Sequence, residues 1–133
     1  MRTVEQLLEA KKPGTWSVLP DDSVFSAIQL MADKSIGAVL VVENDKLAGI
    51  MSERDYARKV ILKNRSSKDT PVRNIMTSKL ICITPEHTID ECMALMSEKK
   101  IRHLPVLQDK KLVGIISIGD VVKSIISERE YTI

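Results

Sequence analysis

The sequence predicts an α/β fold of the α+β type, built from two similar units that are related by an approximate twofold axis. Residues 18–61 repeat without a gap as residues 83–126, so that Pro20 aligns with Pro85. In both copies the apolar pattern changes in one order, which is strand, helix, strand, strand, helix. Solenoid proteins need about three or more units to build a continuous core. Two copies therefore indicate a closed pair.

Composition limits the class of protein. A chain of 133 residues with 44% hydrophobic content has the size of one ordinary domain and can bury a core without metal or disulfide. Its longest apolar runs are far shorter than the roughly 20 residues of a membrane span, and residues 1–10 do not resemble a secretory signal. We therefore expect a cytoplasmic protein with no membrane partner. A net charge of +2 and 3% aromatic residues also argue against a nucleic-acid partner.

Local patterns in each copy predict the individual elements. Ser23 and Thr88 precede helical apolar stripes, and both residue types favour the position just before a helix. Short apolar runs bounded by polar turns predict paired strands, and a second helical stripe follows. The first copy predicts a helix at 24–31, strands at 38–42 and 47–52 around a turn at 44–46, and a helix at 56–61. The second predicts a helix at 89–96, strands at 104–107 and 112–117 around a turn at 109–111, and a helix at 121–126.

The segments that lead into the two copies are also similar. Val4 and Leu7 match Val72 and Ile75, and both segments predict a short amphipathic helix. A stretch rich in serine and charged residues separates the copies and has the composition of a linker. We therefore divide the chain into a first repeat with its leading helix at 1–62, a linker at 63–71 and a second repeat at 72–133.

The two cysteines, Cys82 and Cys92, lie at the start of a predicted strand and on the apolar stripe of a predicted helix. Neither has the spacing of metal ligands. We therefore expect two small buried side chains and no metal site.

A polar motif closes the last strand of both copies. The sequences Gly49-Ile-Met-Ser52-Glu-Arg-Asp55 and Gly114-Ile-Ile-Ser117-Ile-Gly-Asp120 place a carboxylate three residues after a hydroxyl, where a helix begins. One interpretation is a capping pair that satisfies the backbone of that helix. The other is a ligand site, in which the carboxylate accepts hydroxyl groups and the start of the helix donates to an anion. Both interpretations stay open on the residues alone.

These motifs resemble the closing motif of the cystathionine-β-synthase (CBS) domain. The segments Val72-Arg-Asn-Ile-Met-Thr77 and Ile101-Arg-His-Leu-Pro-Val106 resemble further parts of the same domain, and the resemblance covers nearly the whole chain. It implies a CBS pair, or Bateman module, with two clefts between the repeats that bind adenosine-containing ligands. It also implies that two such modules stack into a homodimer.

The resemblance implies roles for particular residues. Asp55 and Asp120 would accept the ribose hydroxyls, and Ser52 and Ser117 would lie beside them. Adenine would occupy an apolar slot in each cleft. The first slot would contain Val18, Ile36, Gly37, Ala38 and Ile50, and the second would contain Ile83, Ile101 and Ile115.

Basic residues make the two clefts unequal. The first motif carries Arg54, Arg58 and Lys59, whereas the second has Gly119 in the place of Arg54. Arg54 and Arg58 are four residues apart on one helix face, so both can address one phosphate chain. A solvated basic face is the other interpretation. We expect the cleft of the first motif to take ATP or NAD, and the cleft of the second motif to take AMP.

Arg102 and His103 break the symmetry of the repeat at the start of a strand, where the first copy has Gly37 and Ala38. In the CBS family this strand start often supplies phosphate contacts. Arg102 suits that role because its charge does not depend on pH. His103 is either a donor to the ligand or a polar residue at the edge of a strand.

The sequence offers little for catalysis. It has no nucleophile elbow, phosphate-binding loop or glycine-rich dinucleotide motif, and the resemblance puts Asp55 and Asp120 in separate clefts. We therefore expect no enzyme and no catalytic cofactor. The predicted function is a regulatory signal-transduction module that binds AMP, ATP or NAD and acts on a separate effector protein whose identity the sequence does not give. S-adenosylmethionine shares the same adenosine, and a ligand-free dimerisation module is the alternative.

Overall fold

The computed structural model describes residues 2–11 and 15–132, with residues 128–132 as backbone only. The chain forms two compact units. The central unit is Trp16–Leu80, and the terminal unit joins Met1–Thr15 to Ile81–Ile133. Each unit combines helices with one small sheet, which confirms the predicted α+β fold of two repeats.

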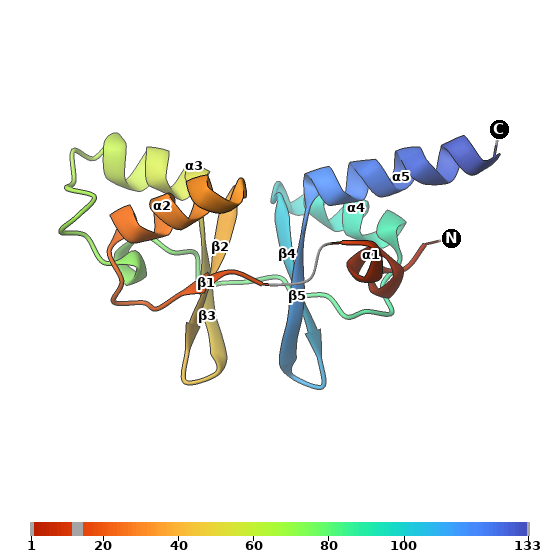
Figure 1. Cartoon of the computed structure of the whole chain (residues 1–133), viewed down its shortest axis with the longest axis horizontal. Coiled ribbons are helices and arrows are strands. Elements are labelled where there is room, and N and C mark those ends of the chain that lie inside the picture. The colour runs from red at the N-terminus through yellow and green to blue at the C-terminus, as the bar shows by residue number, and fades with distance from the viewer. Residues whose placement is uncertain (1, 12–14, 133) are drawn as a thin grey trace. The chain divides into compact units, whose positions relative to one another are not determined.

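The central unit is built on a three-stranded sheet in the order β1-β2-β3. Strand β1 runs parallel to β2, and β2 is antiparallel to β3. Figure 1 shows helices α2 and α3 together near one end of this sheet, with the turn of the β2–β3 hairpin at the opposite end. The elements are β1 (Ser17–Val18), α2 (Val24–Lys34), β2 (Ala38–Glu43), β3 (Lys46–Ser52), α3 (Glu53–Tyr56), the π-helix η1 (Ala57–Ile61) and the 3-10 helix η2 (Val72–Asn74).

The terminal unit repeats this plan with a two-stranded sheet, β4-β5. Ile83 makes an isolated parallel bridge to Val106, at the positions that correspond to Val18 of β1 and Val41 of β2. Figure 1 shows α1 beside this unit, although α1 lies at the other end of the sequence. The elements are α1 (Val4–Ala10), α4 (Ile89–Lys99), β4 (His103–Gln108), β5 (Lys111–Ser117) and α5 (Ile118–Thr132).

Local chemistry explains most of these boundaries. The side chains of Ser23 and Thr88 cap α2 and α4, as the sequence predicts. Both hairpins turn through two residues with positive φ, Asn44-Asp45 and Asp109-Lys110, which matches the twist of paired strands. The second helix of each copy begins earlier than predicted, directly after the motif serine, because that serine already caps it.

The leading segments do not pack where the sequence division placed them. Val4 and Leu7 of α1 lie in the core of the terminal unit, and Thr3 bridges to Thr88. Val72 and Ile75 lie in the core of the central unit. The compact units therefore differ from a division at residues 62 and 72. The segment that precedes the first repeat completes the core of the second repeat, and the segment that precedes the second repeat completes the core of the first.

Two glycines make room for these segments. A Cβ atom on Gly49 would lie 2.7 Å from the carbonyl oxygen of Thr77, and one on Gly114 would lie 2.9 Å from Leu8 Cδ2. The backbone of Thr77 is in turn hydrogen-bonded to Ile50 in both directions, at 2.8 and 2.9 Å. The glycine of each repeated motif is thus a packing requirement of the last strand.

Alternation along the strands separates two faces of each sheet. Val39 and Val41 of β2 pack with Met51 of β3 in the helix-side core. Ala38 and Leu40 therefore point to the opposite face, and both are buried. The terminal sheet follows the same alternation.

The cysteines lie as expected, except that Cys82 is only half-buried. Cys92 is fully buried in the terminal core, where burial and the nearby charge of Glu91 raise the pKa of its thiol to about 11. Among the described residues, no three His, Cys, Asp or Glu side chains gather as metal ligands. None of the helices in the described part of the chain has both the length and the apolar character needed to cross a bilayer.

The glycine contacts lead to a paired prediction. Gly49→Ala should lower the free energy of unfolding by about 1–3 kcal/mol, the usual cost of overpacking, because the new methyl group meets a backbone oxygen. Gly114→Ala should cost clearly less, because the Leu8 side chain can adopt another rotamer. Urea unfolding followed by far-ultraviolet circular dichroism measures both. Equal losses, or a larger loss for Gly114→Ala, would contradict this packing argument.

Candidate functional site

The first polar motif forms a reciprocal cap at the start of α3. The backbone N–H of Asp55 donates to Ser52 Oγ at 3.1 Å, and the backbone N–H and hydroxyl of Ser52 donate to Asp55 Oδ2 at 2.9 and 3.0 Å. The capping interpretation of the sequence is therefore correct for this motif. It does not by itself decide whether the carboxylate also binds a ligand.

The second oxygen of Asp55 is engaged as well. Lys59 Nζ lies 3.0 Å from Asp55 Oδ1 and also donates to the carbonyl of Ile75 at 2.9 Å. The hydroxyl of Thr77 donates to the same Oδ1 at 3.4 Å. With 9% of the residue exposed, Asp55 must release an internal partner before it can accept a ribose hydroxyl.

The second motif is capped in the same way but leaves one oxygen available. The backbone N–H of Ser117 donates to Asp120 Oδ2 at 2.8 Å, and the N–H of Asp120 donates to Ser117 Oγ at 3.1 Å. Lys11 Nζ also lies 2.8 Å from Oδ2. No hydrogen bond from any described residue reaches Oδ1, and 22% of the Asp120 side chain is exposed. This carboxylate can therefore accept an external donor.

Charge keeps Asp120 ionised. Burial alone would raise the pKa of Asp120, but the hydrogen bond and charge of Lys11 and the hydrogen bonds of Ser117 outweigh it and lower the pKa below its ordinary value. Lys11 Nζ is itself fixed by a second bond of 2.8 Å to the carbonyl of Ile115. An ionised acceptor beside an ammonium group suits a ligand that carries both hydroxyl and anionic groups.

The start of β4 brings His103 and the backbone of Arg102 to this motif. His103 is paired with Ser117 across β4 and β5, and the N–H of Ile118 donates to the carbonyl of Arg102 at 2.8 Å. Burial lowers the pKa of His103; the charges of Lys11 and Arg102 act in the same direction, and Asp120 opposes them. His103 is therefore mainly neutral at pH 7, whereas Arg102 is exposed and charged.

The apolar residues of the predicted adenine slots lie in different places. Val18 and Ile83 lie in the helix-side cores of their units. Their side chains face the cores because each residue is paired, in a β-bridge, with a strand residue that faces the same core. Ala38, Ile50 and Ile115 belong to the opposite sheet face, next to the motif serines.

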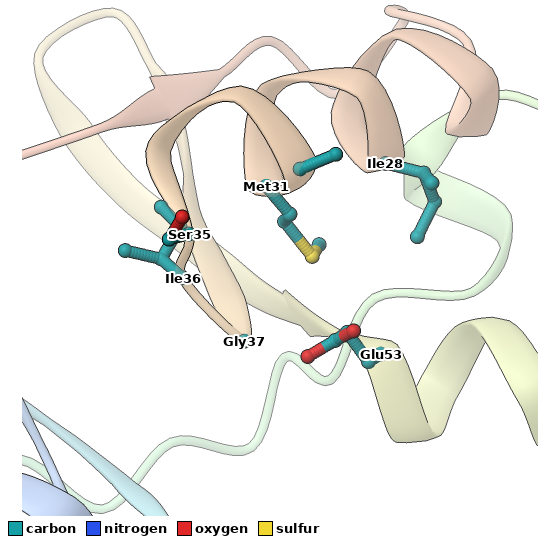
Figure 2. Close-up of a pocket in the computed structure, with 7 residues that line it drawn as sticks. Ile28, Met31, Ser35, Ile36, Gly37 and Glu53 are labelled. Carbon is teal, nitrogen blue, oxygen red and sulfur yellow. The ribbon is translucent and has the colours of Figure 1, made fainter.

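Ile36 and Gly37 line a pocket in the central unit. The pocket has a volume of about 310 Å³, near the lower limit of ligand pockets. Figure 2 shows Glu53, at the start of α3, across this pocket from Ile28 and Met31 of α2. Ala38 and Ile50 do not line it. The full lining is Ile28, Met31, Ala32, Ser35, Ile36, Gly37 and Glu53.

The remaining predicted site residues lie at the surface or beside a core. Ile101 packs against the terminal core, and Gly119 is exposed at the start of α5. Arg54 and Arg58 are exposed and make no ion pair with a described residue. The helix widens into a π-helix at Ala57, and residues four apart still share a face there, as the contact of Lys59 with Asp55 shows.

Lys11 and Thr77 contact the motif aspartates but were not among the site residues that the sequence predicted. Both lie in leading segments and contact the motif of the other repeat through the tertiary fold. One signal was available, because Lys59 of the first copy aligns with Ser124 of the second. A cation beside Asp120 would therefore have to come from elsewhere in the chain.

Comparisons with known sequences agree on one family. The model of the CBS-domain family matches residues 13–62 and 72–127. The CBS domain-containing protein CBSX3, mitochondrial, of Arabidopsis thaliana is 43% identical over 135 residues, which cover 95% of this chain and 66% of that protein. YhcV of Bacillus subtilis (strain 168) is 33% identical over 104 residues, which cover 78% of this chain and 74% of YhcV. The chain thus spans slightly less than two thirds of the plant relative.

Solved structures of CBS proteins share the fold. A protein with CBS domains from Burkholderia ambifaria MC40-6 superposes with a TM-score of 0.92 at 55% identity, over 94% of both chains. The CBS domain pair of MJ0100, in complex with 5′-methylthioadenosine and S-adenosyl-L-methionine, has a TM-score of 0.85 at 24% identity over 96% of this chain and 98% of that one. The second likeness concerns the fold alone.

His103 should make stability depend on pH. Since burial lowers the pKa of His103 from 6.5, the unfolded chain binds this proton more readily, and stability is lost as pH falls below about 6.5. His103→Asn should remove that part of the loss. Urea unfolding at about pH 7.5 and about pH 5.5 gives the difference between wild type and variant. A difference that is the same at both pH values would contradict the prediction.

Proposed function

The chain belongs to the CBS-domain family as a pair of CBS repeats, and we propose that it is a regulatory module that binds an adenine nucleotide at Asp120. The observation that carries this proposal is the half-engaged carboxylate. Its Oδ2 is held by Ser117 and Lys11, while no described residue donates to Oδ1. A charged acceptor held in place in this way is suited to the hydroxyl groups of a ribose.

The surrounding groups match the rest of a nucleotide. The exposed guanidinium of Arg102 and the ammonium of Lys11 are donors for phosphate. Ile115 offers an apolar side chain on the sheet face next to the motif. The neutral ring of His103 adds a donor or an acceptor without further charge.

We propose a weaker site at Asp55 in the central unit. Its ribose contact requires Thr77 or Lys59 to leave Oδ1, which lowers the net gain on binding. The exposed Arg54 and Arg58 support the expectation that a ligand of this motif carries more phosphate, such as ATP or NAD. AMP remains the proposed ligand of the Asp120 motif.

The choice among adenosine ligands is also a proposal. The CBS pair of MJ0100 is described in complex with 5′-methylthioadenosine and S-adenosyl-L-methionine, so one module of this fold accepts adenosine without a phosphate. AMP, ATP and NAD share that adenosine. Since a sensor returns its ligand unchanged, we expect no turnover of ATP or NAD and no catalytic cofactor. A bound ligand can shift the module only by as much as its affinity differs between two conformations, which a separate effector protein would read.

We further propose that the module is a homodimer. Large apolar side chains are exposed on the helices of both units, and twofold dimers are the commonest closed assemblies of soluble proteins. If the motif serines and aspartates act only as caps, this association would be the whole function. The exposed apolar side chains on the helices or at a helix end are Phe25, Ile61, Leu62, Val122 and Ile126.

Thermal unfolding with AMP, ATP, NAD and S-adenosylmethionine, each at about 1 mM, tests nucleotide binding. A ligand present at about 100 times its dissociation constant should stabilise the folded protein by about 2.7 kcal/mol, which raises the Tm by several degrees. Asp120→Asn should abolish the rise with AMP, while Asp55→Asn should retain most of it. No rise with any ligand in the unaltered protein would favour the ligand-free dimerisation module.

Leu62→Glu tests the dimer. With 76% of the residue exposed, this substitution should leave the fold intact and place a charge on the apolar surface of the central unit, so that dissociation becomes easier. Analytical ultracentrifugation should show a larger monomer fraction than for wild type at the same concentration. The exposed Lys63→Glu serves as the charge-changing control. An unchanged dimer in Leu62→Glu would exclude this surface as the interface.

A further inference from the structure

Lys11 and Thr77 occupy equivalent places in the two units. In the central unit the backbone N–H of Thr77 donates to the carbonyl of Ile50 at 2.8 Å, and its hydroxyl donates to the motif aspartate. In the terminal unit Lys11 Nζ donates to the carbonyl of Ile115 at 2.8 Å and to the motif aspartate at 2.8 Å. Ile50 and Ile115 are the same position of the repeat. In both units the leading segment therefore donates hydrogen bonds to a strand carbonyl and to the motif carboxylate. The donors are the neutral groups of Thr77 in the central unit and the ammonium of Lys11 in the terminal unit.

The source of the positive charge also differs between the units. In the central unit Lys59 neutralises Asp55 from one turn along the same helix. The corresponding residue of the terminal unit is Ser124, which is buried and whose hydroxyl has no hydrogen-bond partner among the described residues. None of the described side chains of α5 forms an ion pair with Asp120, and the counter-ion is Lys11 of the leading segment.

The Lys11 ammonium has a donor left over. An ammonium group carries three N–H donors, and two of them are directed to Ile115 and Asp120. No described residue receives a third, and 36% of the Lys11 side chain is exposed. The group is thus fixed in position by two acceptors and still presents one N–H to solvent beside Asp120.

The charge of this cluster favours an anion. Lys11 places a positive charge 2.8 Å from Asp120, and the positive charges of Lys11 and Arg102 both act on the neighbouring His103. A ligand that places hydroxyl groups on Asp120 and a phosphate on the ammonium would complement both signs. A phosphate-free adenosine would leave the remaining N–H of Lys11 without a charged partner.

We propose that Lys11 is the residue that makes the Asp120 site selective for phosphorylated adenosine, by holding its ammonium between Asp120 and the phosphate of the ligand. This inference rests on the proposed nucleotide site at Asp120. Lys11 acts as a specificity residue supplied by the leading segment, in a position that the repeated motif does not contain.

Calorimetric titration with AMP and with adenosine tests the role of Lys11. In Lys11→Met the affinity for AMP should fall about ten- to a hundredfold, the loss expected for one hydrogen bond between charged groups, while the affinity for adenosine should change by less than about threefold. Lys11→Arg keeps the charge and should restore most of the preference for AMP. Lys99→Met removes an exposed charge from the last turn of α4 and should leave both affinities unchanged.

Circular dichroism and urea unfolding of each variant check that the terminal unit is folded. Equal losses of AMP and adenosine in a folded Lys11→Met would mean that Lys11 only orients Asp120, and would overturn this inference while leaving the nucleotide site intact. Should Lys11→Met not fold, Lys11→Gln takes its place: a preference for AMP over adenosine that falls about tenfold or more supports a direct contact, and an unchanged preference opposes it. Failure of the unaltered protein to bind either ligand would remove the nucleotide site and this inference together.

Discussion

The close approach of a leading segment to the last strand of each sheet is the contact on which the rest of the structure depends. Gly49 and Gly114 make room for it, because a methyl group at either position would meet the neighbouring segment at less than 3.0 Å. The same approach seals both cores, since Val72 and Val4 enter them from these segments. It also brings Thr77 and Lys11 to the motif aspartates. The contact between each leading segment and the last strand therefore accounts both for the packing of the cores and for the side chains around the motif aspartates.

The two aspartates start from one sequence motif and end with different chemistry. Each is fixed by a serine at the start of a helix. The difference arises from the third partner, which is a lysine of the same helix for Asp55 and a lysine of the leading segment for Asp120. Since Asp55 has both oxygens engaged and Asp120 has one, the second carboxylate loses fewer internal contacts when it accepts a ligand.

Capping and ligand binding are compatible roles for such a carboxylate. A cap needs one oxygen to accept the backbone N–H of the serine, and that bond fixes the orientation of the other oxygen. In the terminal unit the geometry provides a positioned acceptor with an ammonium beside it. A group held in place before binding has less conformational entropy to lose when the ligand arrives.

The sequence by itself determined the local architecture and the family. The repeat, the caps at Ser23 and Thr88 and the alternation of the strands are set by neighbouring residues, so they could be predicted along the chain. The candidate motif residues Ser52, Asp55, Ser117 and Asp120 were predicted for the same reason, together with their capping interpretation.

Only the tertiary structure decided which segment completes each unit, that Val18 and Ile83 face the cores, and that Lys11 reaches Asp120. Each of these depends on contacts between residues far apart in the sequence, where the periodicity of a single element carries no information. The ion pair of Lys11 with Asp120 joins residues that are 109 positions apart. Its only trace in the sequence is the loss of a lysine from the second helix, at Ser124.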